Sequence, residues 1–224
     1  MKKYCIFVLA VAGWLLAVIA PALATPVIYD NGGPISNNAF VSDFDFPAQM
    51  GDDFILAEGA SIIGDIHWWG IYFNNNTPLS EDDFTIRIFE IADDVPAVTP
   101  FYENNVGNVP RTFTENQVIG TYDSYAYWVE VEPIVLDPNT FYLLSIVNNT
   151  AADSDDNWYW QVATEPSGGH FLWDVKEENW APYFMDELAF NLTAPEPVPE
   201  PATMLLLGSG LLGLAGLRRK FRRK

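Results

Sequence analysis

Cysteine and basic side chains are almost absent from the body of this chain. The only cysteine of the 224 residues is Cys5, close to the start. Residues 25–194 contain 28 acidic residues against three basic ones, a formal charge of −25. The three basic residues are Arg87, Arg111 and Lys176. Such a surface repels nucleic acid, because phosphates need Lys or Arg to replace their counterions. The lack of thiols excludes disulfides and thiol chemistry from this segment.

Sequence signatures of catalysis are absent as well. The chain has no G-x-S-x-G elbow, P-loop, dinucleotide fingerprint or H-E-x-x-H zinc motif. Of the two histidines, His67 lies beside two tryptophans and is predicted to be a packing residue, whereas His170 follows a Gly-Gly turn and is expected to be exposed. Glycoside hydrolysis needs only two carboxylates across a cleft, so a hydrolase stays open as an alternative to a non-catalytic protein.

The first 24 residues have the pattern of a secretory signal peptide. Lys2 and Lys3 form a positive n-region, residues 4–20 are almost wholly apolar, and Ala22-Leu23-Ala24 is an A-x-A cleavage site after Pro21. We therefore expect cleavage after Ala24, which would remove Cys5 and start the mature chain at Thr25. An uncleaved N-terminal anchor is the alternative.

The last thirty residues consist of three segments of different composition. Two Pro-Glu-Pro triplets, at residues 195–197 and 199–201, disfavour regular structure and keep the chain extended. The apolar run 202–217 predicts a short membrane helix, and the basic cluster 218–224 predicts a cytoplasmic end. An ordinary C-terminal anchor would share the last two parts.

This tail resembles the PEP-CTERM sorting domain of Gram-negative bacteria. The resemblance covers residues 195–224 and rests on the apolar and basic segments and on the motif Val198, Pro199, Glu200, Pro201 and Ala202, followed by Thr203. It implies cleavage near this motif by an exosortase, so the expected partners are the exosortase and the export machinery. The precursor would be held in the inner membrane by its C-terminal helix, and the product would reach the cell surface or the extracellular space.

The body, residues 25–194, is predicted to be one all-β domain. Apolar runs alternate with Asn, Asp, Pro and Gly breaks, and no stretch keeps a helical period. The strands expected are residues 61–73, 84–91, 125–131, 141–147, 157–163, 171–175 and 187–192. Short strands without crossover helices favour an antiparallel β-sandwich, and we expect a jelly-roll-like form of roughly eight to ten strands.

Short pieces of the body also resemble a β-sandwich module on other PEP-CTERM proteins, which implies no established activity. These pieces are residues 52–54, 67–70, 83–89, 145–148 and 158–160. Within them, Asp52-Asp53-Phe54 and Asp82-Asp83-Phe84 are similar, but their flanks are not. We interpret this similarity as two strand starts rather than as a duplicated domain.

The acidic turn before residue 158 is a candidate calcium site. Asp153, Asp155 and Asn157 present oxygen atoms at alternate positions, as the first half of an EF-hand loop does. The loop lacks the EF-hand glycine and the closing acid, because Trp158 and Thr164 occupy those positions. A solvated acidic turn is the alternative, and the pairs at 52–53 and 93–94 are weaker candidates.

Trp158 and Trp160 are candidate sugar-binding residues. They share one face of a predicted strand and follow the acidic turn directly, so exposed rings could stack on sugars there. The alternative is that they fill the core. Trp68 and Trp69 must point to opposite faces, so at most one is exposed. We expect a secreted, non-catalytic protein associated with exopolysaccharide, with a purely structural surface component or an extracellular carbohydrate-active hydrolase as alternatives.

Overall fold

The computed structural model describes most of the predicted β domain. It describes residues 25–46, 48–74, 81–152, 157–164, 168–183 and 186–196. The predicted signal peptide with Ala22 and Ala24, the sorting residues 198–202 and the apolar run 202–217 lie outside these ranges, as do Asp153 and Asp155. Within these ranges, no helix is long and apolar enough to span a membrane.

Fourteen strands make up the described part of the chain. They are β1 (Val27–Asp30), β2 (Pro34–Val41), β3 (Met50–Ile55), β4 (Ile62–Phe73), β5 (Phe84–Ala92), β6 (Val95–Pro96), β7 (Tyr102–Gly107), β8 (Arg111–Val118), β9 (Tyr122–Val135), β10 (Phe141–Val147), β11 (Asn157–Ala163), β12 (His170–Asp174), β13 (Asn179–Tyr183) and β14 (Phe190–Thr193). All pairings between these strands are antiparallel. The predicted antiparallel all-β class is therefore confirmed.

The first sheet is organised around the long strand β4. One edge of β4 pairs with β9, which pairs in turn with β8. Along the other edge, β14 pairs with the first half of β4 and β11 with the second half, and β1 and β2 extend the sheet beyond them. Because a strand is pleated, the side chains of β4 alternate between the core and the outer side of the sheet.

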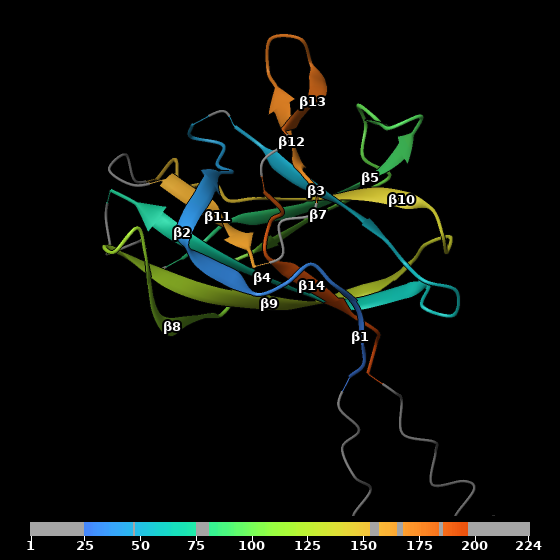
Figure 1. The fold of residues 1–224 in the computed structure, drawn as a ribbon, viewed down its shortest axis with the longest axis horizontal. Helices are drawn as coiled ribbons and strands as arrows, with labels where there is room; N and C mark the ends of the chain where they lie inside the picture. The colour runs from blue at the N-terminus through green and yellow to red at the C-terminus, as the bar shows by residue number, and fades with distance from the viewer. Residues whose placement is uncertain are drawn as a thin grey trace, which may run out of the picture. The chain divides into compact units, whose positions relative to one another are not determined.

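The second sheet has the strand order β13-β12-β3-β10-β5-β6, and β7 also pairs with β5. Figure 1 shows the two sheets as layers, with the β12–β13 hairpin projecting beyond them. By its internal contacts, Thr25–Pro195 forms one compact unit.

Most of the predicted strands are present, but the sheets are larger than expected. The ranges predicted for β10 and β11 match the observed strands, and the other five predicted ranges overlap β4, β5, β9, β12 and β14. The seven other strands were given no range, although the strand start expected at residues 52–54 falls within β3, so eight to ten was an underestimate. β1, β7, β8 and β13 are exposed over half or more of their length, which weakens the apolar alternation that prediction relies on.

Aromatic rings dominate the core between the sheets. Trp68 and Tyr127 are stacked with ring centroids 5.5 Å apart, and Phe84 meets the edge of Trp158 at 5.1 Å. Ile86, Ile88, Leu144 and Ile146 from the second sheet fill the space around them and are fully buried. Burial of this much apolar surface is the main stabilising term of a domain that has no disulfide.

Candidate functional site

The two tryptophans predicted to bind sugar are in the core. Trp158 and Trp160 have no exposed surface, so neither ring can stack on a ligand, and that role for them was wrong. The shared face was predicted correctly, since both side chains point inward while Tyr159 lies on the other side. Two contacts hold the rings there: the indole of Trp158 lies against Gly70, and Trp160 Nε1 donates to the Ala189 carbonyl at 2.9 Å.

Of the two histidines, only His170 lies in an environment opposite to the expected one. His170 was expected to be exposed but is 1% accessible, because it packs between the rings of Phe40 and Tyr183. Its Nδ1 lies 2.6 Å from the Asp186 carbonyl, and burial lowers its pKa. His67 is half-buried on the outer side of β4, where burial also lowers its pKa. It packs against a ring that the sequence did not single out, Trp128.

An exposed aromatic patch lies on the side of the first sheet that faces away from the second. Trp128 on β9 is 46% exposed and stacks on His67 with centroids 6.3 Å apart. His67 is paired with Trp128 on one side and with Asn191 of β14 on the other, so the three side chains form a row across the sheet. Trp69, two residues along β4, is partly exposed on the same side, whereas Trp68 is buried. We call Trp128, His67, Trp69 and Asn191 the outer patch.

Carboxylates border the outer patch. Asp65 precedes His67 by two residues on the same side of β4 and is paired with Glu130 and Thr193. Thr193 Oγ1 donates a 2.7 Å hydrogen bond to Asp65, while Glu130 is exposed. The patch therefore combines aromatic rings with an amide and carboxylates, the mixture typical of sites that recognise polar ligands.

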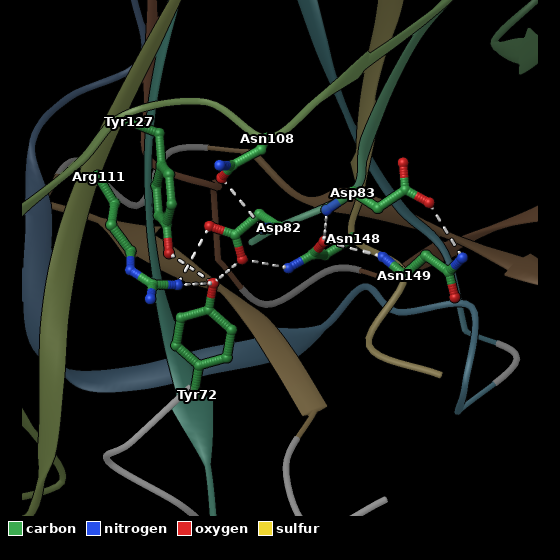
Figure 2. A network of polar contacts seen from close by, with 8 residues as sticks. All are labelled: Tyr72, Asp82, Asp83, Asn108, Arg111, Tyr127, Asn148 and Asn149. Carbon is green, nitrogen blue, oxygen red and sulfur yellow. Dashed lines mark hydrogen bonds and ion pairs between the residues drawn. The ribbon is translucent and has the colours of Figure 1, made fainter. Parts of the chain in front are cut away.

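A second polar cluster links the two sheets at one end of the sandwich (Figure 2). Asp82, just before β5, accepts hydrogen bonds from the Tyr72 hydroxyl, from Arg111 Nη1 at 3.2 Å and from Asn148 Nδ2 at 3.0 Å. Arg111 also donates to Tyr72 at 3.1 Å and lies over its ring. Tyr127 donates to the same hydroxyl at 3.3 Å. We call these five residues the end cluster.

The end cluster fits a structural role better than a chemical one. The side chain of Asp82 is 3% exposed and that of Arg111 21%, so a substrate has little access to the carboxylate. Burial is the main reason that the pKa of Tyr72 and that of Tyr127 are raised, which keeps both hydroxyls neutral as donors. A carboxylate surrounded by so many donors has little capacity left to act as a base or nucleophile.

Two carboxyl groups meet at a third location. Asp52, in the middle of β3, points inward, is fully buried, and shares a hydrogen bond with Glu187. Asn31 Nδ2 donates to Asp52 at 2.9 Å and to Glu187 at 3.5 Å, and the Leu188 amide donates to Asp52 at 2.5 Å. Burial, and then the charge of Glu187, raise the pKa of Asp52 well above its usual value. Asp52 therefore holds a proton at pH values where an exposed Asp is ionised.

This pair bears on the hydrolase alternative. A raised pKa beside a second carboxyl group is what a glycosidase uses for its general acid. Asp52, however, has no exposed surface and lies between Met50 and Phe54, both core residues.

The interpretation of residues 52–54 as a strand start was also wrong, because Asp52 sits inside β3, whereas residues 82–83 do precede β5. Both Asp52 and Asp82 are nevertheless the buried members of their Asp-Asp pairs.

Of the predicted calcium ligands, the structure describes Asn157 only. Its Oδ1 atom is enclosed and has no hydrogen-bond partner in the described part of the chain, so it fits a ligand for a hard cation. Nearby, the Trp158 amide donates a 2.7 Å hydrogen bond to the buried carboxylate of Asp43. This carboxylate also accepts a hydrogen bond from the Thr150 hydroxyl at 2.9 Å. Among the described ranges no three acidic, His or Cys side chains are grouped closely enough to hold a metal. Asp93 and Asp94 form an exposed turn with positive φ.

The fold and its polar clusters define the class as an acidic antiparallel β-sandwich with an exposed aromatic patch. Residues 194–220 match the PEP-CTERM protein-sorting motif, which confirms the resemblance seen in the sequence. The chain carries this sorting signal at its end and is thus an exported substrate of an exosortase. No curated protein matches the chain.

Proposed function

We propose that this exported protein is a non-catalytic component of the cell surface or extracellular matrix that binds exopolysaccharide through its outer patch. The observation that supports this most directly is the exposed ring of Trp128, backed by His67 and flanked by Asn191. The ring stacks on His67 of the paired strand β4, which restricts its rotamers, so little side-chain entropy is lost when a sugar stacks on it. Asn191 and the neighbouring carboxylates supply partners for hydroxyl groups.

Charge favours a neutral polysaccharide as the ligand. The body has a formal charge of −25, and Asp65 and Glu130 lie next to the outer patch. A polyanion would be repelled by this surface unless divalent cations bridged the two. A neutral polymer meets no such barrier, and its hydroxyl groups can donate to the carboxylates.

The two alternatives have less support. A purely structural component without a ligand would leave the grouping of Trp128, Trp69 and His67 at the surface unexplained, although a single exposed ring would be ordinary. A hydrolase would need access to a carboxyl group of raised pKa, and the one that stands out, Asp52, is fully buried.

The proposal is tested by glycan binding of the purified full-length chain. We expect retention on at least one neutral polysaccharide in a panel of immobilised polymers, and a loss of about tenfold in affinity in Trp128→Ala, because stacked rings carry much of the binding energy at such sites. Phe141→Ala is the matched control, since Phe141 is 50% exposed on the other sheet. If the folded protein is retained on no polymer, or if both variants behave alike, the binding role is wrong.

Processing and location form the other part of the proposal. We propose that the precursor is anchored in the inner membrane by residues 202–217 until the exosortase cuts near Pro199-Glu200-Pro201, and that export removes residues 1–24. Mass spectrometry of the surface protein should then show a chain that begins at Thr25 and ends near Pro201. Surface protein that still contains Lys224 would contradict the cleavage.

A further inference from the structure

A small polar pocket opens on the same side of the first sheet as the outer patch. It has a volume of about 300 Å³ and is lined by Pro34, Ile35 and Ser36 of β2, Asn116 of β8, Ser124 of β9 and Gln161 of β11. None of these residues is charged, although the body is strongly acidic. The volume is at the lower end of the range for ligand sites, about 300–1,000 Å³.

Irregularities in two strands frame this pocket. On β8, residues 114–116 stand opposite the single residue Ser124, because the register shifts between Phe113 and Gln117. On β2, residues 35–38 stand opposite Val162 for the same reason. Bulges of this kind redirect side chains and are common beside binding sites. Here they place Asn116 and Ser36 at the rim of the pocket.

Backbone strain is concentrated at the same rim. Glu115 and Ile119 have φ values of 61° and 53°, a region that residues other than glycine rarely adopt. Ile119 is β-branched, so the cost is highest there, and its amide donates a 2.9 Å hydrogen bond to the Ser36 carbonyl, which ties β8 to β2 across the mouth. The surrounding contacts thus maintain a strained backbone next to the pocket.

The floor and the rim of the pocket differ in their hydrogen bonds. On the floor, Ser124 Oγ donates to Gln161 Oε1 at 2.7 Å, and Gln161 Nε2 donates to the Ile35 carbonyl at 3.3 Å. At the rim, the exposed side chains of Ser36 and Asn116 make no hydrogen bond to any residue that the structure describes. A fixed floor with free hydroxyl and amide groups above it suits a ligand rich in hydroxyl groups.

The pocket and the outer patch lie along one continuous surface. Ser124 and Trp128 are four residues apart on β9 and face the same side, a separation of about 13 Å. Between them, Ala126 of β9 is paired with Trp69 of β4, so Trp69 lies along the same side of the sheet between the pocket and Trp128. A ligand that reached from the pocket to Trp128 would therefore be an extended chain rather than a single small molecule.

We propose that the pocket binds one neutral sugar unit of the same polysaccharide chain that stacks on Trp128, so that the site spans several sugar units. This inference rests on the proposed function and adds to it a second contact point, which takes an uncharged sugar unit. It predicts that affinity rises steeply once an oligosaccharide is long enough to reach both contact points.

The experiment measures the dissociation constants of the full-length chain for neutral gluco-, manno- and galacto-oligosaccharides of one to six units by titration calorimetry. For the series that binds best, we expect the double variant Ser36→Ala/Asn116→Ala to raise Kd at least about fivefold for the longer oligosaccharides, through the loss of two hydrogen bonds. It should leave the shortest ligands that bind only at Trp128 unaffected. Asn37→Ala is the matched control, because Asn37 is exposed on β2 but does not line the pocket.

Three outcomes decide between keeping both proposals, keeping only the proposed function and rejecting both. If Trp128→Ala weakens binding while the double variant matches the wild type at every chain length, the pocket is not part of the site, but the proposed function stands. If uronic-acid oligosaccharides bind as tightly as the neutral series, the preference for uncharged sugars is wrong. If the folded wild-type chain binds no oligosaccharide or polymer, both proposals fall. Equal melting temperatures of the variants and the wild type ensure that a loss of binding is not a loss of folding.

Discussion

Gly70 on β4 provides the space that the indole of Trp158 on β11 occupies. A Cβ atom at residue 70 would lie 2.4 Å from Trp158 Nε1, closer than real side chains approach each other. We expect Gly70→Ala to destabilise the domain by about 2–3 kcal/mol, because the ring is enclosed by Phe84 and Tyr127 and cannot move away. Thermal unfolding measures this effect. Gly33→Ala is the control, since nothing lies within 4 Å of a Cβ there, and equal losses in the two variants would contradict the explanation.

Arg111 of the end cluster and Arg87 on β5 each form an ion pair, and we expect the loss of these two pairs to lower the stability of the domain by unequal amounts. Arg111→Met leaves the buried Asp82 carboxylate without its cation, and we expect a loss of about 2–4 kcal/mol, given the partial exposure of Arg111. Arg87→Met breaks the 2.5 Å contact with Glu103, whose side chain is 53% exposed, and should cost about 1 kcal/mol or less. Chemical denaturation of both variants tests the difference.

A second substitution tests whether the unpaired Asp82 carboxylate causes the loss of stability in Arg111→Met. Asp82→Asn in the Arg111→Met background removes the buried charge, so it should recover part of the lost stability. If the double variant is less stable than Arg111→Met, the cost does not arise from an unpaired carboxylate, and the hydrogen bonds to Tyr72 and Asn148 are the dominant contribution.

The carboxyl pair predicts how stability changes with pH. Burial raises the pKa of Asp52, so the folded state binds this proton more tightly than the unfolded chain. The stabilising contribution is fully present below the unfolded pKa of about 3.9 and is lost as pH rises through the folded value. Asn at residue 52 resembles the protonated form at every pH. We expect Asp52→Asn to match the wild type near pH 4 and to melt at least about 2 °C higher at pH 8.

Melting temperatures of the two proteins between pH 4 and 8 provide the measurement. His170 acts in the opposite direction, because burial lowers its pKa and its contribution is lost on acidification, but it is the same in both proteins and cancels in the comparison. Asn37→Ala, at an exposed and uncharged residue of β2, should show a difference from the wild type that does not depend on pH. A pH-independent difference for Asp52→Asn as well would exclude the proposed proton.

The proposed calcium site predicts stabilisation by the metal alone. If Ca²⁺ binds the acidic turn together with Asn157, millimolar Ca²⁺ should raise the melting temperature by a few degrees, because it binds only the folded form. A chelator should reverse the effect, Asp155→Ala should abolish it, and Asp93→Ala should retain it. An unchanged melting curve of the wild type would exclude the site.

Local sequence patterns were enough to predict the positions of the strands that have strong apolar alternation. Residues 141–147 and 157–163 were predicted with the observed bounds, and the opposite directions of Trp68 and Trp69 follow from the pleat alone. The same reasoning could not find β8 or β13, whose exposed residues carry little periodic signal. A signal for Trp128 was present, since it alternates with the buried Tyr127 on one strand, but nothing local says which neighbour faces the core.

The sequence by itself determined the C-terminal sorting motif, the acidic charge and the antiparallel β class, because these depend on composition, local motifs and a period of two residues. Only the tertiary structure decided that Trp158 and Trp160 belong to the core, and that Trp128 and a neutral pocket lie on the outer side of the first sheet. The physical reason is that a strand specifies two faces without specifying which one is covered. That choice depends on the opposite sheet and on spaces such as the one at Gly70, which arise only when distant segments pack together.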